Sequence, residues 1–227
     1  MGASNNTYYN CSKCILVGEF KVHATAFLIG IDEKSSDGLL YASLDYGFSA
    51  TLNYLNMDLV EKQMGETPLC FFLFSLDKDI KKIPEVVKLI RFNKNKNIRY
   101  APIVGFTKSP DPKIVNACLQ FGFDDIVVSP FSIEKTLARQ KELVGKNISF
   151  YETSTYFGPD RRRAESPNMH RDKLHPKRGE GGDYRKVVIS RNSKNGIELI
   201  SDEYHKNDKN NSTSLGQDAK KIIGSAS

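Results

Sequence analysis

Short apolar runs alternate with amphipathic stretches over the first two thirds of the chain. The apolar runs predict five buried strands, at residues 14–20, 39–47, 69–75, 101–106 and 125–129. The stretches between them predict helices, among them residues 21–30 and 48–63. Continuous apolar strands between helices are typical of a parallel sheet covered on both faces. We therefore expect an α/β fold, a flavodoxin-like doubly wound five-stranded parallel sheet.

The later helices carry start signals. Pro84 and Pro112 fit the first turn of a helix, and Asp111 and Ser132 fit the capping position before one. The apolar positions expected to face the core are Val86, Leu89 and Ile90; then Ile114, Val115, Cys118 and Leu119; then Ile133, Leu137 and Val144.

The chain changes character near residue 150. We expect an N-terminal extension over residues 1–11, one folded domain over 12–149, and a polar, mostly disordered C-terminal tail over 150–227, because the tail holds little apolar surface. Two strand-like runs, residues 185–190 and 196–201, could form a hairpin, although an isolated hairpin is marginally stable in water.

Composition excludes some classes of protein. A hydrophobic content of 39% supports a core, and a net charge of +6 is too small to indicate nucleic-acid binding by itself. No apolar run approaches ~18 residues, so no membrane span is expected. Without a signal-peptide pattern, we expect a cytoplasmic protein. Cys11 and Cys14 have metal-like spacing but lack further ligands, so no metal site is expected.

The ends of the last three predicted strands are Ser75, Thr107 and Ser129, the last followed by Pro130. With the segments APIVGFT and GFDDIVVSPF, this order resembles the receiver domain of two-component response regulators over residues 12–145. The resemblance implies a phospho-accepting Asp at the first of these ends, a Ser or Thr at the second, and a Lys before Pro at the third. Only Thr107 matches.

The resemblance also implies an acidic pair after the first strand, where this chain has Gly18 and Glu19, and an aromatic in the fifth strand, where it has Ile126. Mg²⁺ prefers carboxylate ligands, a serine hydroxyl without an adjacent base does not replace an acceptor carboxylate, and Ser129 carries no charge. We therefore expect a degenerate phosphorylation site, no catalysis and no cofactor.

Asp77 leaves an alternative open. It lies two residues beyond Ser75, on the same side of an extended chain, and could be the acceptor of an active receiver that binds Mg²⁺. The full strand before Ser75 and the helix start at Pro84 argue against this register.

One tail segment is distinctive, and is similar to a short tail that follows some alphaproteobacterial receivers. Its residues are Tyr156, Phe157, Gly158, Pro159, Asp160, Arg161, Arg162 and Arg163. Aromatics beside arginines are suited to docking on an acidic or phosphorylated partner. A solvated charge run is the plainer interpretation. The arginines could also bind nucleic acid, which Asp160, Glu165 and Asp172 make unlikely.

No phosphate-binding loop, dinucleotide motif or nucleophile elbow occurs. The sequence thus favours a non-catalytic receiver-like module acting by protein–protein contacts in phosphorelay signal transduction. The resemblance to receivers implies a contact surface on the side of its fourth and fifth helices. Expected partners are a histidine kinase, a phosphotransfer protein or another receiver, with a homodimer possible. The alternatives are a receiver phosphorylated on Asp77 and a nucleic-acid-binding regulator acting through the basic tail.

Overall fold

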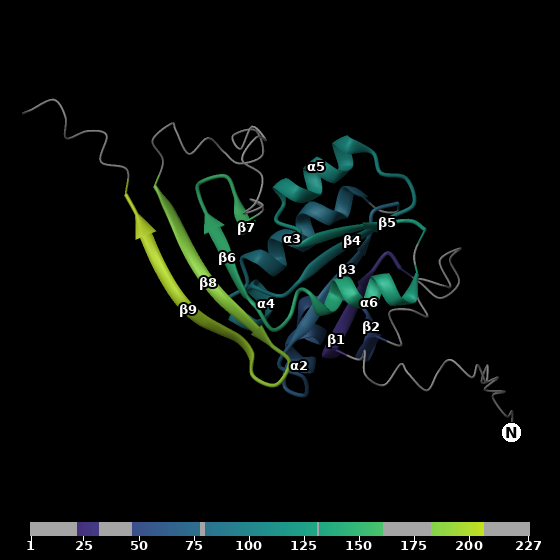
Figure 1. Cartoon of the computed structure of the whole chain (residues 1–227), viewed down its shortest axis with the longest axis horizontal. Coiled ribbons are helices and arrows are strands. Elements are labelled where there is room, and N and C mark those ends of the chain that lie inside the picture. The colour runs from purple at the N-terminus through teal and green to yellow at the C-terminus, as the bar shows by residue number, and fades with distance from the viewer. Residues whose placement is uncertain (1–21, 32–46, 78–79, 131, 161–182, 207–227) are drawn as a thin grey trace, which may run out of the picture.

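The computed structural model describes residues 22–31, 47–77, 80–130, 132–160 and 183–206. Within them, five parallel strands form one sheet in the order β2-β1-β3-β4-β5 (Figure 1). Their bounds are β1 Val22–Ile29, β2 Phe48–Asn53, β3 Cys70–Ser75, β4 Ile103–Thr107 and β5 Asp125–Val128. This order is that of the flavodoxin-like doubly wound folds, so the predicted sheet is confirmed.

The first two strands differ from the prediction. Residues 22–29 form β1 rather than a helix, and β2 lies within residues 48–63, also expected to be helical. β1 is central in the sheet and buries Ala24 and Ala26, while the buried Thr25 hydroxyl hydrogen-bonds that of Thr67 at 2.5 Å. Small and β-branched residues suit such a strand, so tertiary context prevailed over local periodicity.

One face of this parallel sheet is covered by helices whose buried residues pack on Phe72 and Phe74. They are α2 Met57–Gln63, α3 Ile83–Arg91, α4 Lys96–Arg99 and α5 Pro112–Gln120, with the short 3-10 turn η2 Ile80–Lys82 before α3. The predicted caps are confirmed, since Asp111 and the Ser132 that precedes α6 Ile133–Lys141 each accept a backbone N–H. No helix in the described ranges has the length and apolar character needed to cross a membrane.

A second, antiparallel sheet covers much of the other face, in the order β7-β6-β8-β9. Its strands are β6 Asn147–Glu152, β7 Phe157–Pro159, β8 Tyr184–Asn192 and β9 Gly196–His205. Phe150, Val187 and Ile189 join one core cluster with Phe71 of the first sheet and with Tyr100, which follows α4. The predicted hairpin is therefore present as β8 and β9.

This second sheet revises the division of the chain at residue 150. Residues 150–160 and 183–206 belong to the folded body, whereas the sequence predicts a polar, mostly disordered tail over 150–227. The apolar side chains of β6 and β8 alternate along each strand, so each strand buries one face and leaves the other polar. Residues 161–182 and 207–227 lie outside the described ranges.

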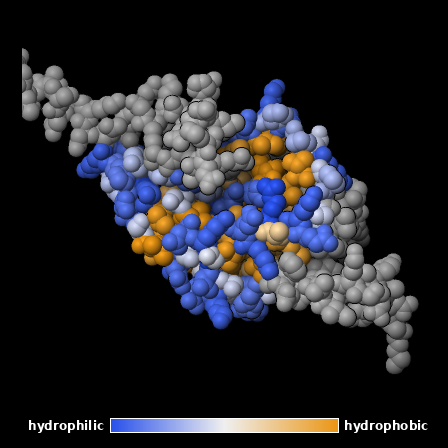
Figure 2. Space-filling model, in the orientation of Figure 1, coloured by the Kyte–Doolittle hydropathy of each residue, from blue (hydrophilic) through white to orange (hydrophobic). Residues whose placement is uncertain are grey.

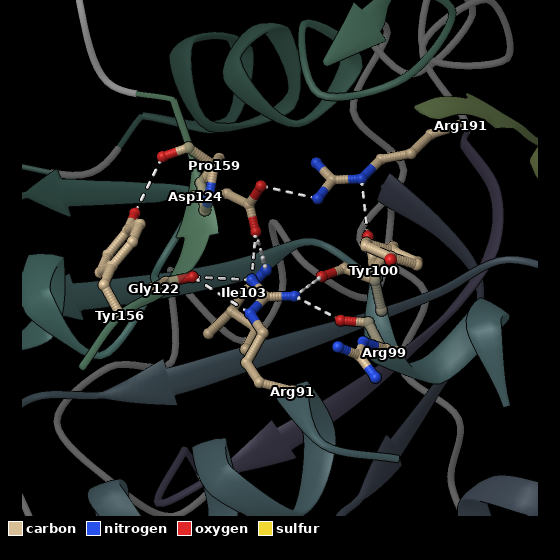
Figure 3. Close-up of polar contacts among 10 residues, drawn as sticks. Arg91, Arg99, Tyr100, Ile103, Gly122, Asp124, Tyr156, Pro159 and Arg191 are labelled. Atoms are coloured by element: carbon tan, nitrogen blue, oxygen red, sulfur yellow. Dashed lines mark hydrogen bonds and ion pairs between the residues drawn. The ribbon is translucent and has the colours of Figure 1, made fainter. Parts of the chain in front are cut away.

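Three buried charged residues join the two sheets at the amino ends of β4 and β5 (Figure 3). Asp124 accepts hydrogen bonds from Arg91 at 2.7 Å, from Arg191 of β8 at 2.6 Å, and from the backbone of Ile103 at 2.8 Å. All three side chains are at most 2% exposed. Arg191 also donates to the Tyr100 carbonyl oxygen at 2.9 Å, so the network ties β8 to the residues that lead into β4.

Candidate functional site

The carboxyl ends of β3, β4 and β5 meet at the edge of the parallel sheet that lies away from the buried arginines. Ser75 is paired with Phe106 of β4, and the Ser129 amide donates to the Thr107 carbonyl oxygen at 2.9 Å. Ser75 and Thr107 are 5% and 3% exposed, and Ser129 is half-buried. The structure thus brings these three predicted positions to one edge, where ligands bind in doubly wound folds.

Asp77 belongs to the same edge. Its carboxylate accepts hydrogen bonds from the Thr107 hydroxyl at 2.7 Å and from the Lys108 backbone N–H at 3.0 Å. The Thr107 oxygen in turn accepts from the Ser109 amide at 3.2 Å. The Asp77 carboxylate therefore bridges the loops that follow β3 and β4.

The residues that directly follow β1 are not those that the sequence pattern predicted. Gly18 and Glu19 lie outside the described residues, and β1 ends at Ile29, level with Phe74 of β3. Gly30, with φ of 70°, and buried Ile31 come next. In the sequence the first acidic residues after β1 are Asp32 and Glu33, which the structure does not describe.

Mg²⁺ requires near-octahedral oxygen coordination, usually with one or two carboxylates. At this edge the described residues offer the Ser75 hydroxyl and the Asp77 carboxylate, which accepts hydrogen bonds from Thr107 and Lys108. Among the described residues no group of three carboxylate, histidine or cysteine side chains could hold a metal ion.

A hollow of about 280 Å³ opens beside Ser75. It is lined by Ile29, Gly30, Tyr54, Leu55, Ser75, Lys82, Ile83 and Val86. Burial, with a smaller contribution from the Glu85 charge, raises the pKa of Tyr54, so its phenol is neutral at physiological pH. Where the receiver resemblance implies an acidic metal site, this part of the edge is largely apolar.

The predicted docking segment is part of the core. Tyr156 and Phe157 are 8% and 5% exposed, and the Tyr156 hydroxyl donates to the Pro159 carbonyl oxygen at 2.9 Å (Figure 3). Gly158 and Pro159 are buried too, and a Cβ on Gly158 would lie 2.7 Å from the Gly122 Cα. These residues cannot serve as exposed anchors. Asp160 donates its amide to the Ser149 carbonyl oxygen, and Arg161, Arg162 and Arg163 lie outside the described residues.

Sequence reasoning missed the two buried arginines. Arg91 follows an apolar helical stripe, and Arg191 continues the inward alternation of Val187 and Ile189. That alternation was the available signal, but a charged residue at such a position is normally exposed.

No protein-family model and no curated protein matches the chain. Similar solved structures include three response regulators. One from Thermotoga maritima has 15% identity and a TM-score of 0.40, and covers 53% of this chain and 96% of its own. A response regulator in red light signaling of R. palustris has 17% identity and a TM-score of 0.37, and covers 53% of this chain and 90% of its own. A two-component response regulator from Clostridium difficile has 20% identity and a TM-score of 0.39, and covers 53% of this chain and 93% of its own. The strand order itself places the parallel sheet in the flavodoxin-like class.

Proposed function

We propose that this protein is a receiver-like signalling module that acts through protein–protein contacts without being phosphorylated. The observation that carries the proposal is the closed arrangement of Asp77, Thr107 and Lys108. The Asp77 carboxylate already accepts hydrogen bonds from one O–H and one N–H donor. A phosphoryl group on Asp77 would have to displace both hydrogen bonds, and Ser129 offers no positive charge in compensation.

The contact surface we propose is formed by β5, the fifth strand of the parallel sheet, and by α5 and α6, the helices that precede and follow it. β5 is an edge strand of the parallel sheet, and Val128 and Phe121 are 38% and 40% exposed there. The second sheet packs on one face of the parallel sheet and is joined through Arg191 to the amino ends of β4 and β5. The partners on this surface would be signalling proteins of a phosphorelay, namely a kinase, a phosphotransfer protein or another receiver, in the cytoplasm. The module would need neither a cofactor nor catalysis.

A receiver phosphorylated on Asp77 is the second candidate, favoured by the 2.7 Å contact between this carboxylate and Thr107. The two candidates differ in one measurement, the intact mass after incubation with acetyl phosphate and Mg²⁺. The proposal predicts an unchanged mass. A gain of one phosphate that is lost in Asp77→Asn, but kept in Asp111→Asn, would replace the proposal by the second candidate. Asp111 is a suitable control because it is an exposed helix cap.

A further inference from the structure

Helix α3 has a second apolar side that the fold does not bury. Its core-facing residues are Ile83, Val87, Ile90 and Arg91. Lys88 and Leu89 lie three and four residues after Glu85, and Phe92 lies four and three residues after them, so the four residues share one outward face. Leu89, which the sequence pattern predicted to face the core, is 50% exposed, and Phe92 is 60% exposed.

This outward face borders a hollow of about 590 Å³ between α2 and α3. The residues that line it are Glu61, Glu85, Lys88, Leu89, Phe92, Asn93 and Lys94. The smaller hollow beside Ser75 is lined by Ile83 and Val86 of the same helix. Leu55, which also lines it, is 75% exposed. The apolar band is thus limited to Leu89 and Phe92 at the end of α3, with Leu55 beside the start of the helix, and exposed apolar surface of this kind is typical of interaction sites.

The charges beside the band have a particular order along the helix. Glu85 lies in the first turn of α3, and Lys94 follows its last turn. Lys88 lies between them on α3, and Glu61 lies on the neighbouring α2; both are exposed. In the part of the chain that the structure describes, none of the four has an ion-pair partner. Such a surface is complementary to itself when it is turned end for end.

We propose that two copies of this chain associate through α3 in antiparallel orientation about a two-fold axis. Glu85 of each copy would then face Lys94 of the other, and the two Leu89 side chains would be buried near the axis. A two-fold contact uses the same patch on both partners, so each favourable pair is formed twice. The band is small, and the association is accordingly weak and reversible.

The exposed edge strand β9 is a less suitable surface for self-association. Strand β9 exposes Leu199 and Ile200 at the edge of the second sheet, and on the face drawn in Figure 2 hydrophobic residues reach the surface in separate patches among hydrophilic ones. However, β9 carries Glu198, Asp202 and Glu203. Two copies paired along this edge would oppose like charges, which disfavours a dimer there.

The test is charge reversal with rescue, read by sedimentation equilibrium of the full chain. Glu85→Lys and Lys94→Glu should each weaken self-association about ten-fold or more, because each places like charges together twice. The double variant restores opposite charges across the axis and should recover an affinity near that of the wild type. Leu89→Lys should abolish the dimer. Circular dichroism of each variant would show that the fold is retained.

Ile200→Lys, an exposed apolar position on β9, is the matched control and should leave self-association unchanged. A wild-type chain that stays monomeric at about millimolar concentration would overturn the proposal, as would a dimer insensitive to Leu89→Lys. Loss of the dimer in both single variants without recovery in the double variant would also overturn it, because the antiparallel charge pairing would then be absent.

Discussion

Arg191 of β8 donates a hydrogen bond of 2.6 Å to the carboxylate of Asp124, 67 residues earlier in the chain. Because both side chains are almost fully buried, this contact makes the second sheet part of the same folded unit as the parallel sheet. The contact lies at the amino ends of β4 and β5, away from the carboxyl edge that holds Ser75, Thr107 and Asp77.

Asp124→Asn should lower the free energy of unfolding by about 3 kcal/mol or more, since removing the carboxylate leaves the buried charges of Arg91 and Arg191 without a compensating charge. Urea unfolding measures the effect. Arg139→Met is the control, because Arg139 pairs with Asp125 at the surface with 48% of its side chain exposed, and should change stability by only about 0–1 kcal/mol. Equal effects of the two changes would mean that the buried network contributes nothing special.

The stability contributed by Asp124 should depend on pH. Burial alone would raise the pKa of Asp124, but the charges of Arg191 and Arg91 more than offset burial and hold the pKa below its ordinary value. Such a group stabilises the fold above its unfolded pKa of about 3.9, and this stability is lost as pH falls through the folded pKa. The difference in unfolding free energy between the wild type and Asp124→Asn should therefore be largest near neutral pH and shrink below about pH 4. A difference that grows on acidification would refute the assignment.

Phe157→Ala should destabilise the whole protein by about 3–5 kcal/mol, because its ring packs against Tyr100, Phe150 and Phe92. Phe121→Ala should cost much less, since Phe121 is 40% exposed. Thermal unfolding of the two variants provides the comparison. If Phe157→Ala instead left the melting temperature unchanged, residues 156–159 would have to be regarded as an accessible segment after all.

The hydrogen bond between Thr107 and Asp77 should be measurable as a coupling energy. A double-mutant cycle with Asp77→Ala and Thr107→Val is expected to give about 1 kcal/mol, a modest value because Asp77 is exposed to water. A coupling energy near zero in urea unfolding would show that the two side chains do not interact in solution.

The sequence predicted the second half of the parallel sheet better than the first. β3, β4 and β5 are uninterrupted apolar runs with clear helix starts between them at Pro84 and Pro112, so their period and limits were readable. β1 was mistaken for a helix because its alanines and Thr25 fit either state locally. Only its position between β2 and β3 decides the matter.

The site was predictable in position but not in its bonding. The strand ends Ser75, Thr107 and Ser129 meet as expected, since parallel strands bring their carboxyl ends to one edge. The contact of Asp77 with Thr107 and Lys108 depends on the path of the loop after β3, which no local pattern specifies. The burial of Tyr156 and Phe157 depends on the second sheet, whose long-range pairing with the body lies beyond local periodicity.

The most direct test of a receiver-like module that works without phosphorylation is the amide NMR spectrum of the full chain with Mg²⁺ and beryllofluoride, which mimics a phosphoryl group on a carboxylate. The account predicts that the Thr107 and Lys108 amide signals stay in place across the titration, because the Asp77 carboxylate already accepts hydrogen bonds from the Thr107 hydroxyl and the Lys108 N–H. A saturable shift of both signals in the wild type, absent in Asp77→Asn, would contradict it.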